Sequence, residues 1–349
     1  MSDNIKVNII GAGVIGLTTG LILQRNGNKV QIISDYFPGD YNINYTSPWA
    51  GAHWRLEESK NKEFDKFFES TYKVLFDLSN VPETGIIQLQ SYEFHDEKPE
   101  MNLMNKDFHN LKGIPSKELP PNAKFGIVYT TVTIDVPKYL HWLLDQFINA
   151  GGKTRKMHIS HINEAFEDDV HIVVNCTGIC AKTLGGVEDN TVFPTKGQTV
   201  SVWAPHVKAV YTQIDRDVIT YIIPRESGEV ILGGIKDEHN YNEKPDLKLA
   251  EEIIQRCAKL CPELIAGRST KDLKIMGHNV GRRPSRVDGT RIEIEIKEIS
   301  KGKNGIICHN YGHHSYGYAT SWASCSEATK LIEEAIKKYK PNLIINSKL

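Results

Sequence analysis

The strongest constraint on the fold is a strand, a glycine-rich turn, a helix and a second strand ending in an acid, all near the N-terminus. Within the turn, Gly11 permits a tight bend, Gly13 lets the backbone approach a pyrophosphate, and Gly16 lets helix and strand pack closely. The helix N-terminus presents unpaired N–H groups to the phosphates. Asp35 follows the second strand and is placed to accept hydrogen bonds from a ribose. This order predicts a dinucleotide-binding unit, and it leaves FAD and NAD both open.

Length, charge and hydropathy exclude several classes of protein. At 349 residues the chain is long for one core, so two lobes are expected. A formal net charge of −1 argues against a nucleic-acid or anionic-membrane surface as partner. No apolar run approaches the ~20 residues that span a bilayer, and the N-terminus lacks the basic and apolar regions of a signal peptide.

Cysteine spacing and the last three residues bear on cellular location. The six cysteines are scattered without a CxxC pair, which indicates reduced, mostly buried thiols rather than a disulfide framework or a zinc site. The chain ends in Ser347-Lys348-Leu349, the tripeptide that the peroxisomal import receptor reads. We therefore expect a peroxisomal matrix protein with that receptor as a partner; self-association into a homo-oligomer is left open.

The remaining pattern predicts an α/β protein with two interleaved lobes. Four short alternating strands without intervening helices fill 191–235, which is typical of an antiparallel sheet and differs from the opening unit. Small-residue turns follow a buried-type strand at Thr177-Gly178, and a glycine-rich turn precedes a closing helix over 321–339. That helix offers a second N-terminus able to stabilise negative charge.

Blocks spread over nearly the whole chain resemble the family of D-amino-acid oxidases and D-aspartate oxidases, flavoproteins with a glutathione-reductase-like FAD-binding fold. The specific combination is the run 281–286, Gly-Arg-Arg-Pro-Ser-Arg, together with 309–312, His-Asn-Tyr-Gly. The resemblance implies FAD, and oxidation of a D-amino acid by O2 with release of H2O2. It implies a discontinuous FAD domain from about 1–55, 136–190 and 275–349, and an antiparallel-sheet substrate domain from 56–135 and 191–274. The cofactor-binding residues so implied are Gly11, Ala12, Gly13, Val14, Ile15, Gly16, Asp35, Thr46, Ser47, Ala50, Gly51, Ala52, Thr177, Gly178, Gly312 and Gly317.

The same resemblance gives roles to three residues at the reacting end of the substrate. Arg283 stands at the family's carboxylate-binding position, where a guanidinium supplies a planar two-donor clamp; the alternative is a structural arginine in a basic loop. Tyr221 matches the tyrosine whose hydroxyl helps hold the same carboxylate, although a tyrosine in a strand is more often packing. Ser315 is expected near the substrate amine.

Cationic or ionisable residues suggest a preference for acidic D-amino acids such as D-aspartate. Lys236 stands where yeast relatives carry a second active-site tyrosine, and the alternative for Lys236 and Arg216 is a solvated surface charge. Histidines near the expected flavin ring lack zinc spacing, so no metal is expected. The residues predicted to face the substrate side chain are Lys236, Arg216, His53, His313 and His314. The alternatives are a broad D-amino-acid oxidase, a nicotinamide-dependent dehydrogenase, and a non-enzymatic dinucleotide sensor.

Overall fold

The computed structural model describes residues 5–55, 62–99, 108–167, 169–170, 172–216 and 218–345, and the chain divides into two compact units. The first unit comprises 1–48, 140–195 and 282–349, and the second comprises 49–139 and 196–281. The expected domains were discontinuous in the same order, and the expected boundaries lie four to seven residues from these, by seven at both 55 and 275. Ala50, Gly51, Ala52 and His53 consequently belong to the second unit.

The first unit is a parallel sheet with helices on it, so the expected α/β class is confirmed. Its described strands lie in the order β14-β15-β7-β1-β2-β6, and all neighbours are parallel except the β14–β15 pair. Apolar runs such as Ile172–Asn175 are buried along their whole length, as expected for strands covered on both faces. The elements are β1 (Lys6–Ile10), β2 (Lys29–Ser34), β6 (Lys153–Lys156), β7 (Ile172–Asn175), β14 (Arg291–Ser300), β15 (Lys303–Tyr311), α1 (Val14–Arg25), α3 (Val136–Asn149) and α5 (Ser321–Ile345).

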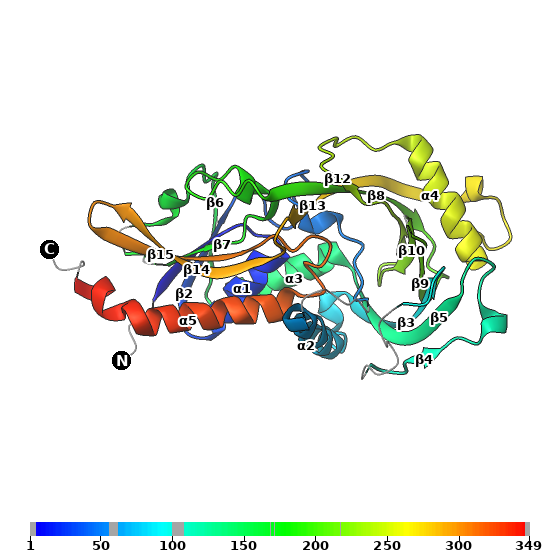
Figure 1. Ribbon diagram of the computed structural model, residues 1–349, viewed down its shortest axis with the longest axis horizontal. Helices are drawn as coiled ribbons and strands as arrows, with labels where there is room; N and C mark the ends of the chain where they lie inside the picture. Colours follow the sequence, from blue (N-terminus) through cyan, green and yellow to red (C-terminus); the bar gives the residue numbers. More distant parts are fainter. Residues whose placement is uncertain are drawn as a thin grey trace. The chain divides into compact units, whose positions relative to one another are not determined.

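Helices α1 and α5 pack on each other and on this sheet (Figure 1). Helix α1 has buried residues on nearly all sides because it lies between β1 and β2 and the long closing helix α5. The strand register then brings the carboxyl ends of four strands to one edge, since Ile10 pairs with both Ile33 and Asn175, and Asn175 pairs with His309. Ligands of open α/β sheets bind at such an edge.

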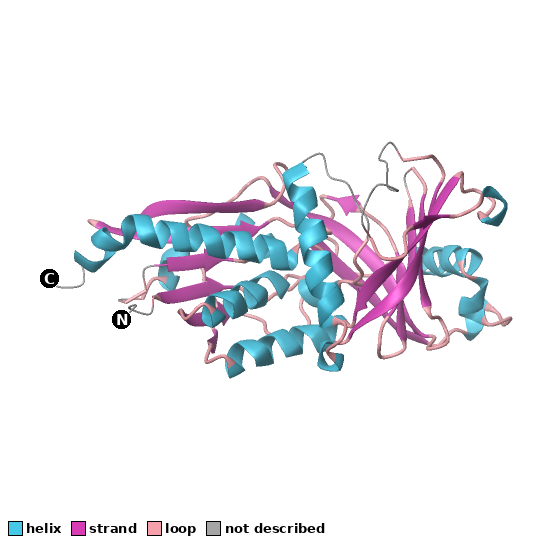
Figure 2. Cartoon of the chain, turned by 90° about the horizontal axis from the view of Figure 1, so that it is seen from below, coloured by secondary structure: helices cyan, strands magenta, loops and turns pink. Residues whose placement is uncertain are grey.

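The second unit is built on a mostly antiparallel sheet, drawn in magenta like the other strands in Figure 2. The strand order is β12-β8-β11-β10-β9-β3-β5-β4, with β13 paired to β8. This sheet matches the strands predicted over 191–235. Elements α3, β8 and β13 each cross a boundary between the units. The remaining bounds are β3 (Ile86–His95), β4 (Lys112–Gly113), β5 (Phe125–Ile134), β8 (Val192–Trp203), β9 (Ala209–Ile214), β10 (Ile219–Pro224), β11 (Glu229–Gly233), β12 (Asp237–Glu238), β13 (Ile275–Arg286), α2 (Lys62–Leu78) and α4 (Leu247–Leu260).

Helix α4 fixes which face of this sheet is the apolar core. Its side chains Ile253, Ile254 and Cys257 are buried against alternate residues of β8, β10 and β11, among them Ile222 and Leu232. Because side chains alternate along a strand, Tyr221 lies on the face opposite α4, directly across from Thr212 and Gly233. The amphipathic pattern of α4 therefore decides which face of the sheet presents Tyr221.

Cysteines and membrane-spanning segments give two further structural findings. All six cysteines lie in the described part of the chain and are free thiols; five are buried, and Cys180 is partly so. Burial raises the pKa of Cys325 to about 12, which keeps this thiol protonated. Among the helices that the structure describes, none is long and apolar enough to cross a membrane.

Candidate active site

The glycine turn after β1 has the geometry that its sequence predicts. Gly11 has a φ of +105°, which only glycine adopts without strain. A Cβ on Gly16 would lie 1.9 Å from the carbonyl oxygen of Gly11, so the helix could not approach the strand so closely with any other residue. The turn also lies against the end of β7, where the N–H of Cys176 donates to Ile10 O at 3.0 Å. Two predicted cofactor loops, 11–16 and 177–178, are therefore neighbours.

The N-terminus of α1 is open towards an anion. Its N-cap residue, Gly13, makes no side-chain capping bond, so the first-turn amides of Ile15 and Gly16 can donate to phosphate oxygens. Ser47 Oγ accepts from the Val14 N–H at 3.0 Å, and the Tyr45 hydroxyl donates to Ala12 O at 2.8 Å. The segment 45–47 is thereby held against the turn, which places the predicted residues Thr46 and Ser47 beside the helix terminus.

Asp35 follows β2 at the same sheet edge, as expected for an acid that binds a ribose. Its carboxylate contacts His158 Nδ1 at 2.9 Å and 3.1 Å, and this hydrogen bond raises the pKa of His158. Both side chains are well exposed. Asp35 therefore remains accessible, and a ribose would compete with His158 for the same carboxylate oxygens.

Arg283 lies on β13, and the residues on either side of it form hydrogen bonds to three different segments of the chain. Thr46 Oγ1 donates to Arg282 O at 2.8 Å, and the His314 N–H donates to Pro284 O at 3.0 Å. The Ser285 hydroxyl bonds that of Thr195 at 2.7 Å. Because the backbone on both sides is fixed to the predicted loops at 46 and 314, the position of Arg283 is held relative to them.

The loop after β15 brings Ser315 to this stretch, and it changes the interpretation of His313. His314 has a φ of +53°, and its Nδ1 contacts Ser315 Oγ at 2.5 Å. His313 is fully buried, with Nε2 3.2 Å from the Ser324 hydroxyl of α5. Burial lowers the pKa of His313 to about 3. His313 is thus neutral and packed on α5, which gives no support to a charged contact with the substrate side chain; the predicted roles of His313 and His314 stay predictions.

Asp189 organises a cluster that the sequence did not indicate. Its carboxylate accepts from Arg286 Nε at 2.8 Å, from the Tyr311 hydroxyl at 2.8 Å and from the Thr191 hydroxyl at 2.5 Å. Burial would raise the pKa of this carboxyl, but these hydrogen bonds hold it well below its usual range. Gly312, at a φ of +84°, packs directly on the Arg286 side chain. The cluster joins the end of β13, just past Arg283, to the start of the 312–317 loop.

In the second unit, the Tyr221 ring lies on the two glycines at the end of β11, Gly233 and Gly234. A Cβ on Gly233 or Gly234 would approach the Tyr221 ring or hydroxyl to 2.1 Å and 2.5 Å respectively, so only glycine leaves room for the ring. Tyr221 is half-buried, and its role remains a prediction. Lys236 follows these glycines and is exposed, which leaves its predicted role open as well.

Arg216 lies in the turn between β9 and β10, where it forms an ion pair with Glu97. Its guanidinium is 74% exposed, and its backbone N–H donates to Asp96 at 3.3 Å. A cation that pairs with an acid on an exposed turn is the solvated surface charge that we named as the alternative. The structure therefore does not support Arg216 as a contact for the substrate side chain.

His53 and the cofactor-type segment 50–52 are fixed within the second unit. Arg225 donates from Nε to Gly51 O at 2.8 Å and from Nη2 to Ala50 O at 2.9 Å. It thereby positions this segment, a role that the sequence around Arg225 did not indicate. Burial, with a smaller contribution from Arg55, lowers the pKa of His53 to about 4. His53 is consequently neutral, and its buried Nε2 has no hydrogen-bond partner among the described residues. His53 could therefore contact a substrate side chain as a neutral hydrogen-bonding group, and its predicted role stays a prediction.

Glu93 forms a second buried charge cluster, on β3. It contacts Arg55 Nη1 at 3.2 Å, His95 Nε2 at 2.9 Å and the Tyr129 hydroxyl at 3.3 Å. Burial would raise the pKa of Glu93, but Arg55 and His95 lower it further, so the carboxylate stays ionised. The charge of Arg55 is thus balanced within the unit.

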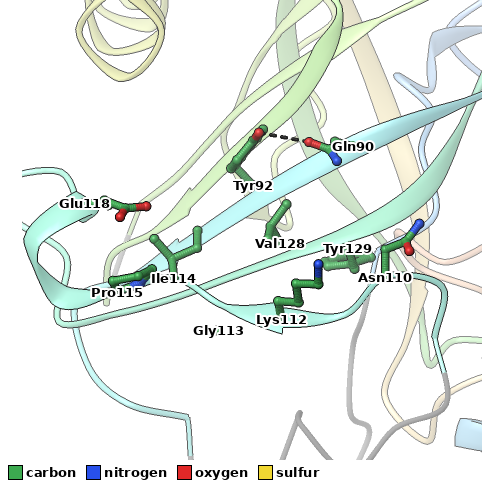
Figure 3. Close-up of a pocket in the computed structure, with 10 residues that line it drawn as sticks. All are labelled: Gln90, Tyr92, Asn110, Lys112, Gly113, Ile114, Pro115, Glu118, Val128 and Tyr129. Carbon is green, nitrogen blue, oxygen red and sulfur yellow. Dashed lines mark hydrogen bonds between the residues drawn. The ribbon is translucent and has the colours of Figure 1, made fainter.

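A depression of about 490 Å³ lies elsewhere on the second unit (Figure 3). It is lined by β3, β5 and the segment 110–118, with Tyr92 bonded to Gln90 at 2.9 Å along one wall. None of the predicted site residues lines it, and Lys112 and Glu118 are its charged residues. Nothing in its lining indicates a reaction.

Comparison with known proteins identifies the family. A family model described as FAD dependent oxidoreductase matches residues 6–331. The chain belongs to this family. It is 36% identical over 341 residues to a D-amino-acid oxidase of Schizosaccharomyces pombe, with 94% of this chain and 96% of the relative covered. It is 28% identical to a D-aspartate oxidase of Cryptococcus neoformans var. grubii, with 95% and 97% covered. A solved glycine oxidase from Bacillus cereus has a TM-score of 0.75 at 20% identity, covering 94% of this chain and 97% of that one, which shows a shared fold.

Membership of the family decides between FAD and NAD, because the family is one of FAD-dependent oxidoreductases. The residues present fit it: an uncapped helix N-terminus at Gly13 for the pyrophosphate, Asp35 at the end of β2 for a ribose, and the close glycine turn. The expectation of a flavoprotein enzyme is therefore confirmed, and the nicotinamide-dependent alternative and the dinucleotide sensor are set aside. The individual cofactor contacts stay predictions.

Proposed function

We propose that this protein oxidises D-amino acids with O2, giving a 2-oxo acid, ammonia and H2O2 with consumption of one water. The observation that carries the proposal is the fixed stretch around Arg283, because its flanking residues are bonded to Thr46, His314 and Thr195. A guanidinium carried by backbone that is fixed beside predicted cofactor loops suits a substrate with a carboxylate next to the reacting carbon. The relatives named above support the same substrate class.

Substrate orientation is the main task of the protein's own residues in this reaction. Bound FAD would supply the two-electron acceptor for oxidation at the substrate Cα, with O2 as the final oxidant. Arg283 binds the substrate carboxylate through two charge-assisted hydrogen bonds. Ser315, hydrogen-bonded to His314, is positioned on the loop next to Pro284 to orient the amine. Tyr221 keeps the carboxylate-binding role that the family resemblance gives it.

The proposal is tested by a peroxide-coupled assay over matched D- and L-amino acids. D-enantiomers should release H2O2 in proportion to substrate consumed, and L-enantiomers should not, because separate groups fix the carboxylate, the amine and the Cα hydrogen. Equal rates with both enantiomers, or turnover without peroxide, would contradict it.

We further propose that acidic D-amino acids, D-aspartate above all, are preferred, and Lys236 is the residue on which this rests. A charge pair at ~4 Å is worth roughly 4 kcal/mol at an effective dielectric near 20, and desolvation of both charges removes a sizeable part of it. The remaining energy would favour acidic over neutral substrates about ten- to hundredfold in kcat/KM. Because Lys236 is exposed, we expect the lower end of that range. The D-aspartate oxidase among the relatives is consistent with this preference.

Substitution of Lys236 tests the preference. We expect Lys236→Met to lower kcat/KM for D-aspartate about tenfold, with little change for D-asparagine or D-alanine. Arg216→Ala is the matched control, since Arg216 is engaged with Glu97 on an exposed turn, and it should leave all three values unchanged. A wild-type preference for D-alanine, or an equal loss for all three substrates in Lys236→Met, would leave a broad D-amino-acid oxidase.

Peroxisomal import through Ser347-Lys348-Leu349 remains a proposal, and these residues lie outside the described part of the chain. Import receptors read such tripeptides as exposed tails. Deletion of the three residues should leave catalytic activity intact and move the protein from peroxisomes to the cytosol, as seen by imaging a fusion tagged at its N-terminus. Unchanged peroxisomal signal after deletion would show that another segment directs import.

A further inference from the structure

A chain of buried and partly buried hydrogen bonds in the first unit runs from β14 to the predicted cofactor loop at Thr177. Glu295 Oε2 is 3.0 Å from His309 Nε2, and His309 Nδ1 is 3.2 Å from Asn175 Nδ2. Asn175 Oδ1 accepts from the Thr177 N–H at 3.2 Å and from the Thr177 hydroxyl at 2.7 Å. The chain crosses the adjacent strands β14, β15 and β7 (Figure 1).

The donor and acceptor at each step follow from the Thr177 backbone. An N–H can only donate, so Asn175 must present its carbonyl oxygen to Thr177 and its amino group to His309. An amino group can only donate in turn, so His309 Nδ1 carries the lone pair and Nε2 carries the proton. Glu295 accepts that proton's hydrogen bond. His309 and Asn175 are both 0% exposed, so solvent cannot substitute for either partner.

This chain of hydrogen bonds constrains the Thr177 hydroxyl, which belongs to the predicted cofactor loop. The Thr177 hydroxyl has one hydrogen, and it is used in the bond to Asn175. Thr177 Oγ1 can therefore only accept from a further partner. A phosphate oxygen is itself an acceptor, whereas a ribityl or ribose hydroxyl or a ring N–H is a donor.

We propose that Glu295 and His309 are positioning residues for the flavin: they fix the amide of Asn175 so that Thr177 accepts a hydrogen bond from a hydroxyl or N–H of FAD. This inference rests on Thr177 binding FAD, and it does not depend on which amino acid is the substrate. Glu295 is 35% exposed and also lies 3.7 Å from Arg291. A matched control must therefore separate loss of that ion pair from loss of the His309 contact.

Glu293 supplies the control, because it also pairs with Arg291, at 2.6 Å, and lies across from His309 on β15. The hydrogen bond to His309 Nε2, however, is made by Glu295. We expect Glu295→Ala to weaken FAD binding to the apoprotein about tenfold. Glu293→Ala should change it less than twofold, and Glu295→Gln, which keeps an acceptor oxygen, should restore most of the affinity. Dissociation constants are measured from the change in flavin fluorescence on binding, and the His309 tautomer from its imidazole ¹⁵N shifts.

Each outcome decides the proposal. Weaker binding in Glu295→Ala alone, with His309 losing its Nε2-protonated form, supports it. Equal effects of Glu295→Ala and Glu293→Ala, no effect of either, or weaker binding with the tautomer unchanged would overturn it. Should Glu295→Ala not fold, Thr177→Ser and Thr177→Val test the other end. Serine should retain FAD affinity and valine should lose about tenfold, and equal affinities would also overturn it.

Discussion

Replacement of Arg283 by alanine is expected to lower kcat/KM for D-amino acids at least a hundredfold while leaving the FAD content unchanged. The guanidinium would supply two charge-assisted hydrogen bonds to the substrate carboxylate, together worth ~3 kcal/mol or more, and a loss of that size corresponds to a factor of about a hundred. The backbone around Arg283 is held by Thr46, His314 and Thr195, so the variant should keep the fold of this stretch. Steady-state kinetics with peroxide detection and the flavin absorbance spectrum give both values.

Arg282→Ala is the control for the charge and the position in the chain. Arg282 contacts Asn44 through Nη1 at 3.2 Å, and its carbonyl, which alanine retains, accepts the bond from Thr46. We expect an effect below tenfold on kcat/KM. If Arg282→Ala cost as much as Arg283→Ala, or if Arg283→Ala retained near-normal efficiency, the carboxylate would have to be bound elsewhere.

The second large effect is expected on stability, from Asp189→Ala. This change removes the shared acceptor of Arg286, Tyr311 and Thr191 and leaves the largely buried guanidinium of Arg286 poorly compensated. Breaking a buried pair by removing one partner costs about 3–5 kcal/mol. Denaturant unfolding at neutral pH should therefore show a free energy of unfolding lower by about 3 kcal/mol, since Asp288 compensates part of the charge.

Asp288→Ala is the matched control, because Asp288 lies 3.6 Å from the same arginine but is 66% exposed. An exposed ion pair contributes about 0–1 kcal/mol, so little change is expected. A loss in Asp288→Ala equal to that in Asp189→Ala would show that the buried cluster does not set stability.

The cluster also predicts a pH dependence with a definite sign. The pKa of Asp189 is lower in the folded than in the unfolded protein, so its contribution is fully present above the ordinary aspartate pKa. The contribution is lost as the pH falls from about 4 towards the folded-state pKa. The difference in unfolding free energy between wild type and Asp189→Asn should therefore shrink at acid pH; a constant difference would contradict the assignment.

The sequence determined the elements whose function is local. The turn Gly11–Gly16 and its flanking strands could be predicted because a φ of +105° and a 1.9 Å approach tolerate only glycine. The alternating strands over 191–235 and the amphipathic helix α4 were equally readable, since side-chain periodicity follows from local geometry. The resemblance of several sequence blocks to D-amino-acid oxidases predicted that the dinucleotide is FAD. The match to the family of FAD-dependent oxidoreductases confirmed this prediction.

Only the tertiary structure decided the charge state and accessibility of the predicted side-chain contacts. Arg216, His53 and His313 carry similar weight in the sequence. Yet Arg216 forms an exposed ion pair with Glu97, His53 is a half-buried neutral histidine, and His313 is a fully buried neutral one. Asp189 and Glu295 likewise hydrogen-bond to residues that are distant in the chain, Arg286 and His309 respectively. Neither acid lies in a recognisable sequence motif, so these contacts could not be predicted. A residue's pKa and hydrogen bonds depend on burial and on neighbours from other strands, and spacing along one chain does not encode those directly.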